Sequence, residues 1–494
     1  MEDFLLKLTP YQTIFYNEWM LSPSRIDYNI VFDQSMSGAI DISRLNSSLV
    51  RFMNNHLLLN SNVINKSGNL FWKHRPLLSA DTQILTVFSE DPGPEEIFKL
   101  ALQPFDLEKD PLARFYAIKL SNGGYRTIHI FHHIIIDGLS ADSVYAELGV
   151  YYNDQDYVNP INLTEQKNLN EKLSDQFEKI LAKGKTEMSD FWKNSLQEVE
   201  NVGFKFLEHS EPFHSKAGKR EPLLSNPVSE ARFSFSESVF LQVKELISKY
   251  KLTPYTYGQM VLAVLLHKIS GINNLVINCP IGITEGQNFI FGANINTILK
   301  EYRFNKESSL QDLIDQNIEY TRQLKKSKGR YFPIEELVNY VPSNLLEFRF
   351  VQTNLKDVII PYEGAGEVTI NTELHVDLVG KLSFDQEVRD GVLNYKVRYS
   401  NQEFNAELVS GLAEMYERLF IDMLGDLLDE NTHHLITDYE LLDEKAYQHV
   451  MHYGNGIEAN SPEDKTIHEL FEAQVERTPD RTALVFNDVQ LTYR

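Results

Sequence analysis

The sequence predicts an α/β protein in which two blocks of alternating strands and helices are joined by a charged helical segment. Three observations lead to this prediction. Strand-like runs alternate with helices whose apolar residues recur every three or four positions. Residues 165–200 are charged and helical in character, and they separate an earlier block from a later one. The chain has 494 residues, which is too many for one compact core.

The first block begins with a helix and leads to a strand that carries two adjacent histidines. Residues 43–56 place four apolar side chains at helical spacing: Leu45, Leu49, Phe52 and Met53. Strand-like stretches follow at 82–88 and 114–120, and the apolar run 125–133 favours a further strand. In this strand, one face is predicted to hold Ile128, Ile130 and His132, and the other His129, Phe131 and His133.

After this strand the chain is predicted to turn and to enter a helix. Ser140 is predicted to cap that helix, and the residues that share its apolar face are Val144, Leu148 and Tyr152. The two histidines therefore stand at a strand-to-helix corner. In α/β folds such corners commonly expose reactive side chains, because the loop is shaped freely on a rigid frame.

The second block continues the alternation. Helices are predicted near 237–250, near 255–269 and from about 405 to 429, and a buried strand at 274–283. Two paired strands are predicted near 373–379 and 391–400. The second of these alternates in character, with Leu393, Tyr395, Val397 and Tyr399 at every other position.

The end of the chain has a different composition. Residues 441–465 include the stretch "MHYGNGIEANSPED", rich in Gly, Asn, Ser and Pro, and are predicted to form a linker. Beyond it, 466–494 predict a helix at 467–477, a stop at the Thr-Pro pair 478–479, and two short strands. This segment is too short to bury a core, so we expect it to be the start of another domain.

Composition limits the classes of partner. Lys and Arg number 47 against 70 Asp and Glu, a formal charge of -23, which argues against a nucleic acid or an anionic membrane as the main partner. A single cysteine, Cys279, excludes an intramolecular disulfide and fits a reducing compartment. The N-terminus lacks the features of a secretory signal, and no run reaches the roughly 18 apolar residues of a membrane span. We expect a cytoplasmic enzyme.

The stretch "IHIFHHIIIDGLSADSV" (128–144) carries the chemistry that stands out most in the sequence. Histidine exchanges protons near neutrality because its unperturbed pKa is about 6.5. Neighbours on a strand point to opposite faces, so only one of the pair is expected in a site. His133 lies nearer the turn and is the predicted catalytic residue, a general base or a group that positions a nucleophile. His132 is predicted to support it from beneath.

Two residues beyond the pair have predicted supporting roles. Asp137 is expected either to neutralise a buried cation or to form hydrogen bonds across the loop. Gly138 is expected to supply a backbone conformation, or a close approach, that a side chain would block.

A structural interpretation of the histidines stands beside the catalytic one, because most histidine pairs serve a core or a surface. The full pattern HHxxxDG, however, would arise by chance in a chain of this size about one time in a thousand. Its rarity favours function. A second pair in "HHLITDY" (433–439) has the aspartate but lacks the glycine, and no apolar strand leads into it. We therefore favour a structural role for that pair.

Other chemistries find little support. The sequence contains no GxxxxGK[ST] loop, no HExxH, no GxSxG and no paired CxxC, so neither a nucleotide-dependent nor a zinc mechanism is expected, and no metal site. Cys279 lies in an apolar strand, where a lone cysteine usually packs.

These residues resemble a known family. "HHIIIDG" resembles the HHxxxDG signature of the condensation-domain superfamily of nonribosomal peptide synthetases. "LTPYQTIFYNEWML" (8–21), with Gln12, is similar to its first motif, and "FGANINTILKEYRF" (291–304) to its Gly-x-x-x-Asn-Thr motif. "YFPIEEL" (331–337) resembles the Pro-Phe-Glu motif with Ile334 in place of Phe, and "SDFWKNSL" (189–196) the segment that opens the second lobe. From residue 466 the chain resembles the opening of an adenylation domain.

The resemblance implies a fold and a reaction. The fold would be two chloramphenicol-acetyltransferase-like lobes forming a V-shaped pseudo-dimer, with lobes at 1–175 and 176–440, as a monomeric part of a longer synthetase. The reaction would join a donor acyl or peptidyl thioester on one carrier protein to the amine of an aminoacyl thioester on another. Both would arrive on 4'-phosphopantetheine arms, and the domain itself would bind no cofactor. Asn296 and Ser140 are candidates for the substrate tunnel.

The sequence also departs from the family. The second motif, Arg-His-Glu-x-Leu-Arg-Thr, reads "NHLLLNS" (55–61), with Asn60 where the second arginine is expected, and Thr284 replaces the arginine of a Gly-Arg pair. Because such arginines usually pair with the motif aspartate, Asp137 is left without an evident partner and is expected to use another arginine or hydrogen bonds. Three alternatives stay open: a starter domain that attaches a fatty acyl group, an epimerization domain, and a non-catalytic module that recruits partner proteins.

Overall fold

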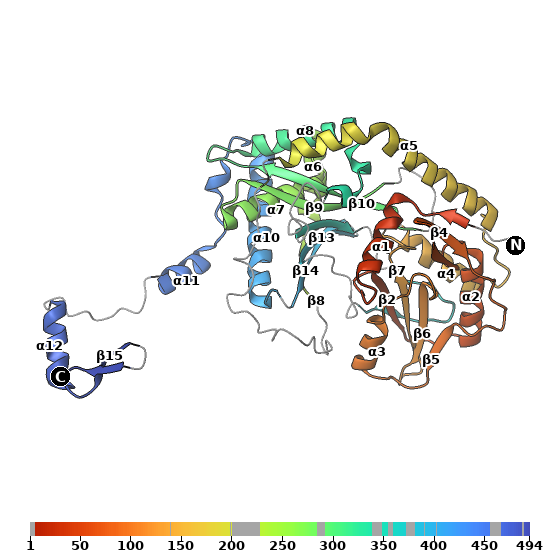
Figure 1. Ribbon diagram of the computed structural model, residues 1–494, viewed down its shortest axis with the longest axis horizontal. Coiled ribbons are helices and arrows are strands. Elements are labelled where there is room, and N and C mark those ends of the chain that lie inside the picture. The colour runs from red at the N-terminus through yellow and green to blue at the C-terminus, as the bar shows by residue number, and fades with distance from the viewer. Residues whose placement is uncertain are drawn as a thin grey trace. The chain divides into compact units, whose positions relative to one another are not determined.

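The computed structural model describes residues 5–138, 140–197, 199, 228–283, 292–337, 348–353, 359–371, 381–389, 391–401, 403–454, 466–486 and 489–494. The chain forms two compact units, Met1–Leu441 and Leu442–Arg494. In the first unit the two larger sheets, each with its own helices, form two parts (Figure 1). We call them the first and the second lobe.

The first lobe is built on a five-stranded sheet in the order β12 (Val368–Ile370), β2 (Asn29–Met36), β7 (Tyr125–His132), β6 (Ala113–Lys119) and β5 (Leu85–Phe88). Its helices include α2 (Ile42–Asn55), α3 (Pro94–Ala101) and α4 (Ala141–Asn153). A small second sheet consists of β1 (Leu5–Lys7), β4 (Asn69–His74) and β3 (Ser61–Lys66). Asp41 caps α2, whose four predicted apolar residues are all buried. Strand β7 is buried almost throughout, between β2 and β6.

The second lobe has a six-stranded sheet in the order β10 (Ile295–Arg303), β9 (Asn274–Gly282), β11 (Phe348–Thr353), β13 (Leu382–Arg389), β14 (Val392–Ser400) and β8 (Val228–Phe235). Its helices include α6 (Glu237–Tyr250), α7 (Pro254–Ser270), α8 (Leu310–Ser327) and α10 (Ala406–Leu428). Ten consecutive residues of α7, Tyr257–Leu266, are buried, because apolar residues surround this helix on all sides.

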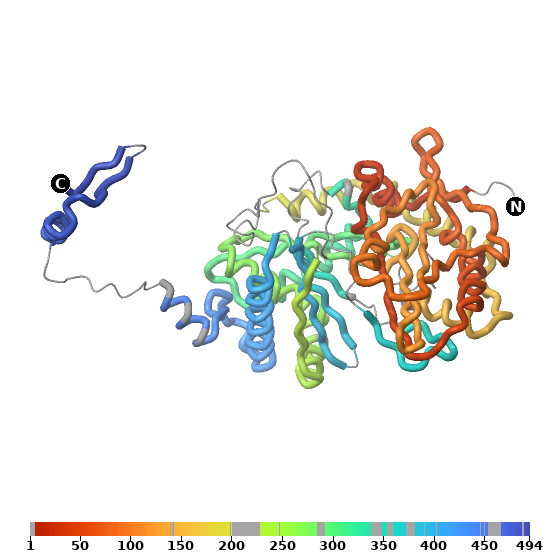
Figure 2. Tube along the Cα trace, turned by 90° about the horizontal axis from the view of Figure 1, so that it is seen from below, coloured from red at the N-terminus to blue at the C-terminus, as the bar shows by residue number. Residues whose placement is uncertain are grey.

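Two segments connect the lobes. Helix α5 (Leu163–Leu196) is continuous, so it runs through the position 175/176 at which the sequence suggested a change of lobe. Its early part, with Phe177, packs on Tyr11 of α1 (Pro10–Leu21), and its late part buries Trp192 in the second core. Strand β12 comes from the later part of the chain but pairs with β2 of the first lobe. Figure 2 shows this segment in teal against the orange strands.

The structure corrects some predicted elements. Strand β14 pairs with β13 and β8, whereas the partner expected at 373–379 lies outside the described residues. Helix α11 (Glu444–Gly454) occupies part of the stretch expected to be a linker. Its start is favoured by Asp443, whose carboxylate accepts a hydrogen bond from the backbone N–H of Ala446 at 2.6 Å. The predicted helix at 467–477 and the two strands after it are present as α12 (Ile467–Arg477), β15 (Thr482–Phe486) and β16 (Val489–Thr492).

Within the described part of the chain, the helices are too short or too polar to cross a bilayer. The same residues include no group of three or more His, Cys, Asp or Glu side chains placed to hold a metal ion.

Candidate active site

The predicted corner lies where β7 ends. His132 is the last residue of the strand, and its backbone N–H still donates to Leu112 O at 3.0 Å. His133 stands in the turn that follows, and its backbone N–H donates to Tyr28 O at 2.8 Å. Both main chains are therefore fixed by the neighbouring strands of the first lobe.

The two histidine rings do not lie on opposite sides of the sheet, and that prediction was wrong. The ring of Phe15 lies 6.5 Å from the ring of His132 and 5.3 Å from that of His133, measured between centroids. The ring of Tyr28 lies 6.0 and 6.3 Å from the same two rings. The alternation of side chains holds only inside a strand, and His133 has left the strand.

His132 has the buried, supporting position expected for it, with 4% of its surface exposed. Its Nδ1 accepts a hydrogen bond from the backbone N–H of Ile134 at 3.1 Å, so in the neutral ring the proton is on Nε2. The pKa of His132 is lowered to about 3, mainly by burial and to a smaller extent by His133, Arg25 and Arg114. The ring is therefore neutral at physiological pH.

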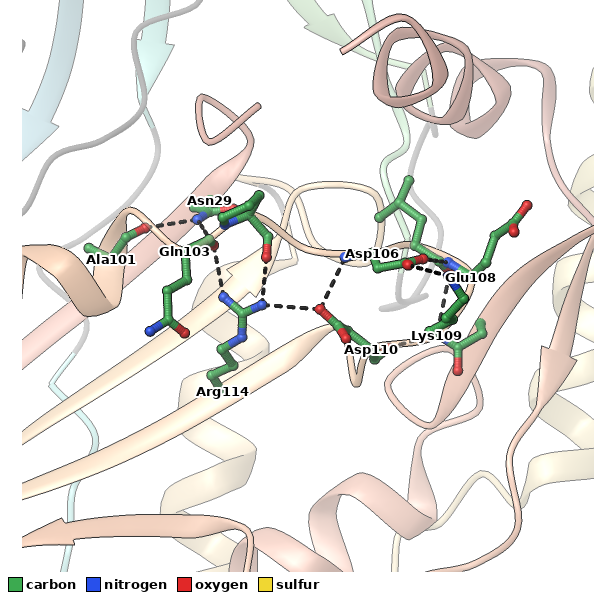
Figure 3. Close-up of polar contacts among 11 residues, drawn as sticks. Asn29, Ala101, Gln103, Asp106, Glu108, Lys109, Asp110 and Arg114 are labelled. Atoms are coloured by element: carbon green, nitrogen blue, oxygen red, sulfur yellow. Dashed lines mark hydrogen bonds and ion pairs between the residues drawn. The ribbon is translucent and has the colours of Figure 1, made fainter. Parts of the chain in front are cut away.

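Figure 3 shows the polar contacts that Arg114 makes with the loop that precedes it, the loop that also carries Phe105. The edge of Phe105 contacts the His132 ring at 5.8 Å, and the guanidinium of Arg114 lies over the Phe105 ring at 3.9 Å. Arg114 also donates to the backbone oxygens of Gln103 and Pro104, at 2.8 and 2.7 Å. These contacts hold the loop that carries Phe105 against the histidine.

His133 is the more accessible of the pair. It is partly exposed, and its ring stacks on Phe15 with an interplanar angle of 25°. Its Nδ1 is buried and has no hydrogen-bond partner among the described residues. Because Nδ1 is buried, Nε2 is the nitrogen that we expect to act on a substrate.

Asp137 accepts hydrogen bonds from both sides of the loop. Its Oδ1 accepts from the backbone N–H of Ser140 at 2.9 Å and from the Ser140 hydroxyl at 2.8 Å. Its Oδ2 accepts from the backbone N–H of Asn294, in the segment before β10, at 2.8 Å. The carboxylate is buried, so these donors offset the loss of water around its charge.

The corner is joined to the segment before β10 by further backbone contacts. The backbone N–H of Gly292 donates to Ile135 O at 2.9 Å, and that of Ala293 donates to Ile134 O at 3.1 Å. Gly292 has φ +126°, and a Cβ on it would lie 2.5 Å from the Nε2 of Gln12. The positive φ and this close approach both favour glycine at position 292.

Two predictions at the corner need correction. Ser140 stands at the N-cap position of α4, but its side chain does not cap the helix, because the hydroxyl bonds Asp137 instead. Gly138 is exposed, its φ is not in the left-handed region, and a Cβ on it would meet no atom of the described residues within 4 Å. The protein itself therefore provides neither of the reasons proposed for glycine at 138.

Asn296 links β10 to the turn after α8. Its Nδ2 donates to Arg330 O at 2.8 Å and to Phe332 O at 2.7 Å, and the side chain is buried. Of the residues at which the sequence departs from the family pattern, Asn60 is buried and donates to Pro76 O at 3.4 Å. Thr284 lies outside the described residues.

The second histidine pair and Cys279, which the sequence also raised as candidates, both have contacts typical of structural residues. His434 lies after α10, with its Nδ1 2.7 Å from Asp426 Oδ2 and its ring stacked on Tyr439 at 4.6 Å. Cys279 is fully buried, and burial raises the pKa of its thiol to about 12, so it is not a nucleophile at neutral pH.

The sequence interpretation missed Phe15, Tyr28 and Asn294. The first two come from "IFYNEWML" and the stretch that follows it, where aromatic residues are dense enough to have been a signal. No local signal in the sequence indicates that the main chain at Asn294 would meet Asp137.

Two α/β lobes in one chain, with a histidine corner bonded to the segment before β10, are the arrangement of the condensation-domain class of protein. A family model described as "Condensation domain" matches residues 4–451, and the chain therefore belongs to this family.

Comparison with curated proteins agrees with this assignment. The chain is 23% identical over 481 residues to bacitracin synthase 3 of Bacillus licheniformis, an alignment that covers 93% of this chain but 7% of that protein. The chain thus spans only a small part of the relative it matches. Its class is that of the condensation domains of nonribosomal peptide synthetases, which are amide-bond-forming acyltransferases.

Solved structures show the same fold at low identity. A four-domain nonribosomal peptide synthetase, holo-AB3403, matches with a TM-score of 0.71 and 18% identity, covering 99% of this chain and 38% of that chain. The X-domain from teicoplanin biosynthesis matches with a TM-score of 0.67 and 15% identity, covering 90% of this chain and 98% of that chain.

Proposed function

We propose that this chain catalyses amide-bond formation between two carrier-bound thioesters. The observation that supports it most is the position of His133, which is partly exposed at a corner that is bonded to the segment before β10. The amine of the acceptor aminoacyl group attacks the carbonyl carbon of the donor thioester. A C–N bond forms, the C–S bond breaks, and the donor's phosphopantetheine leaves as a thiol.

In this mechanism His133 acts on the attacking amine. An α-ammonium must lose a proton before its nitrogen can attack, and a base contributes about 10²- to 10⁴-fold to such a step. His133 takes that proton on Nε2 or orients the amine. His132 is neutral and buried, so it adds no charge and serves as support. Holding both thioesters at one point contributes roughly 7 to 11 kcal/mol by removing the bimolecular encounter.

Gly138, Ser140 and Asn296 are proposed to shape the path of the substrate. Gly138 is exposed beside the corner, and the absence of a side chain leaves its backbone open to a substrate arm. Ser140 and Asn296 are buried with their side chains bonded to protein atoms, so they shape the tunnel walls rather than bind the substrate.

The test is H133A, assayed for dipeptide formation between a loaded donor carrier and a loaded acceptor carrier. We expect a loss of at least about 100-fold, from the contribution of a general base. The matched control is H433A, at an exposed histidine after α10, which should retain full activity. Undiminished product from folded H133A would disprove the proposed role.

The alternatives are separated by their products. A starter domain would accept a fatty acyl donor, and an epimerization domain would exchange deuterium at the Cα of a carrier-bound residue. The similarity to an X-domain concerns the fold alone. A non-catalytic recruiting module would bind a carrier or another protein tightly and form no product.

The proposed partners are a donor and an acceptor peptidyl carrier protein and an adenylation domain in the same chain. Within 466–494 helix α12 has no buried residue. Five apolar side chains of β15 and β16 are more than half exposed: Leu484, Val485, Phe486, Val489 and Leu491. An apolar hairpin of this kind is expected of a fragment, and the rest of an adenylation domain would cover it.

The proposed adenylation domain is tested by extending the chain. A longer protein with a full adenylation domain after residue 494 should show much slower amide hydrogen exchange across α12 than the present chain. Equal exchange rates in the two proteins would contradict the assignment. The proposed division of a monomeric, cytoplasmic synthetase is 1–175 and 176–440 for the lobes, with α5 crossing the boundary and β12 returning to the first-lobe sheet. Residues 441–465 would be a linker that contains α11, and 466–494 the adenylation segment.

A further inference from the structure

The orientation of the His133 ring is not set by a hydrogen bond at Nδ1. An imidazole that works through one nitrogen is usually oriented by a hydrogen bond at the other. Here Nδ1 is buried and has no hydrogen-bond partner in the part of the chain that the structure describes. The backbone N–H bond to Tyr28 O fixes the main chain but not the rotation of the ring. Another contact must hold the ring.

Two aromatic side chains contact the His133 ring from different directions. Phe15 stacks on it at 5.3 Å with an interplanar angle of 25°, and Tyr28 meets it edge-on at 6.3 Å and 87°. Phe15 and Tyr28 also contact each other edge-on, at 4.8 Å and 69°. Both arrangements are favoured between aromatic rings. Together the two residues restrict rotation of the imidazole about both of its side-chain bonds.

Both residues are themselves fixed by other parts of the first lobe. The Tyr28 hydroxyl donates to Glu18 Oε2 at 2.5 Å. The Arg25 guanidinium donates to the same oxygen at 2.5 Å, and this guanidinium lies 4.7 Å from the centre of the Tyr28 ring. Phe15 is buried on helix α1, whose start is closed by a capping box between Thr9 and Gln12. The aromatic contacts are therefore rigid.

We propose that Phe15 and Tyr28 are positioning residues that set the ring orientation of His133 and direct its Nε2 to the reacting amine. This inference rests on the proposed function for its effect on catalysis, but the ring orientation itself is a property of the free protein. A positioning residue differs from an ordinary core residue, because replacing a core residue would lower stability without changing the ring orientation of His133.

The kinetic test compares F15L with F115L. Both changes replace a buried phenylalanine by leucine, but Phe115 contacts His129, at 5.4 Å, rather than the histidine pair. We expect F15L to lower kcat at least 10-fold with little change in the KM for the acceptor carrier, and F15Y, which keeps the ring, to recover most of the loss. F115L should lose similar stability and keep its kcat. Equal kcat values for F15L and F115L would overturn the proposal.

A second readout does not depend on turnover. In protein labelled at histidine, the ring protons of His133, assigned by comparison with H133N, should be shifted upfield by the stacked Phe15 ring. F15L should abolish this shift and F115L should preserve it. An unchanged shift in F15L would disprove the ring contact. If the shift behaves as expected but H133A is fully active, the proposed function fails while the positioning contact stands.

Discussion

The carboxylate of Asp137 and the backbone N–H of Asn294, which are 157 positions apart, are joined by a hydrogen bond of 2.8 Å. This bond runs from the loop that follows β7 to the segment that leads into β10. The corner that carries His133 is therefore held by parts of the chain that are far apart in sequence. Its geometry depends on the packing between them.

Replacing Asp137 tests this bond. D137A should lower the free energy of unfolding by about 2 to 4 kcal/mol, because it leaves buried donors without a charged acceptor. S140A removes a local hydroxyl but keeps the bond to Asn294, so it serves as the control. Amide hydrogen exchange at Asn294 should be faster in D137A and nearly unchanged in S140A. Equal exchange at Asn294 in D137A and the wild type would show that the bond does not hold this segment.

Two buried histidines predict a dependence of stability on pH. Burial lowers the pKa of both His129 and His132 to about 3. In the unfolded chain these rings take up a proton below a pKa of about 6.5, whereas in the folded chain they stay neutral. The stabilising contribution is complete above pH 6.5 and is lost as pH falls towards 3. Between pH 7 and pH 5 it falls by about 2 kcal/mol for each ring.

The check is urea denaturation of the wild type and of H129L at pH 7 and pH 5. H129L should show a smaller loss of stability on acidification, by about 2 kcal/mol, since one of the two rings is gone. His129 contacts Phe115 and lies away from the Phe15 and Tyr28 rings that surround the pair, so the site is left in place. An identical pH dependence in the variant would exclude this explanation.

Two glycines beside the site are predicted to respond differently to alanine. G292A should destabilise the protein by about 1 to 3 kcal/mol, because φ is +126° and the new Cβ would meet Gln12. G138A should change the free energy of unfolding by less than about 0.5 kcal/mol, since its Cβ meets open space. Thermal denaturation of the two variants measures the difference. The reverse order of stabilities would contradict this account of the corner.

The thiol of Cys279 is predicted to resist alkylation in the folded protein. It is fully buried, and its pKa is raised to about 12, so at pH 8 very little thiolate is present and no reagent reaches it. Treatment with iodoacetamide followed by mass spectrometry should find the native chain unmodified and the urea-unfolded chain modified. Rapid labelling of the native protein would show that the second-lobe core opens readily.

Local patterns were sufficient for several elements. Helices near 43–56, 237–250 and 405–429 lie within one residue or two of α2, α6 and α10, because each has a regular apolar stripe. The pair lies at the end of an apolar strand, and this position also predicted that His132 is buried and that His133, nearer the turn, is more exposed. The alternation rule failed at His133, since that residue lies one position beyond the strand. The cap predicted for Ser140 failed because its backbone is already helical and its hydroxyl oxygen accepts from the backbone N–H of Asp137 instead.

The sequence by itself determined that two α/β blocks exist, that the family motifs are present, and that His133 is the residue of interest. These features depend on periodicity and on short spacings, which are visible along the linear chain. Only the tertiary structure decided that Phe15 and Tyr28 surround the His133 ring and that Asn294 bonds Asp137. Such contacts join residues that are distant along the chain. They are set by how helix α1 and the segment before β10 pack against the end of β7, which no local pattern specifies.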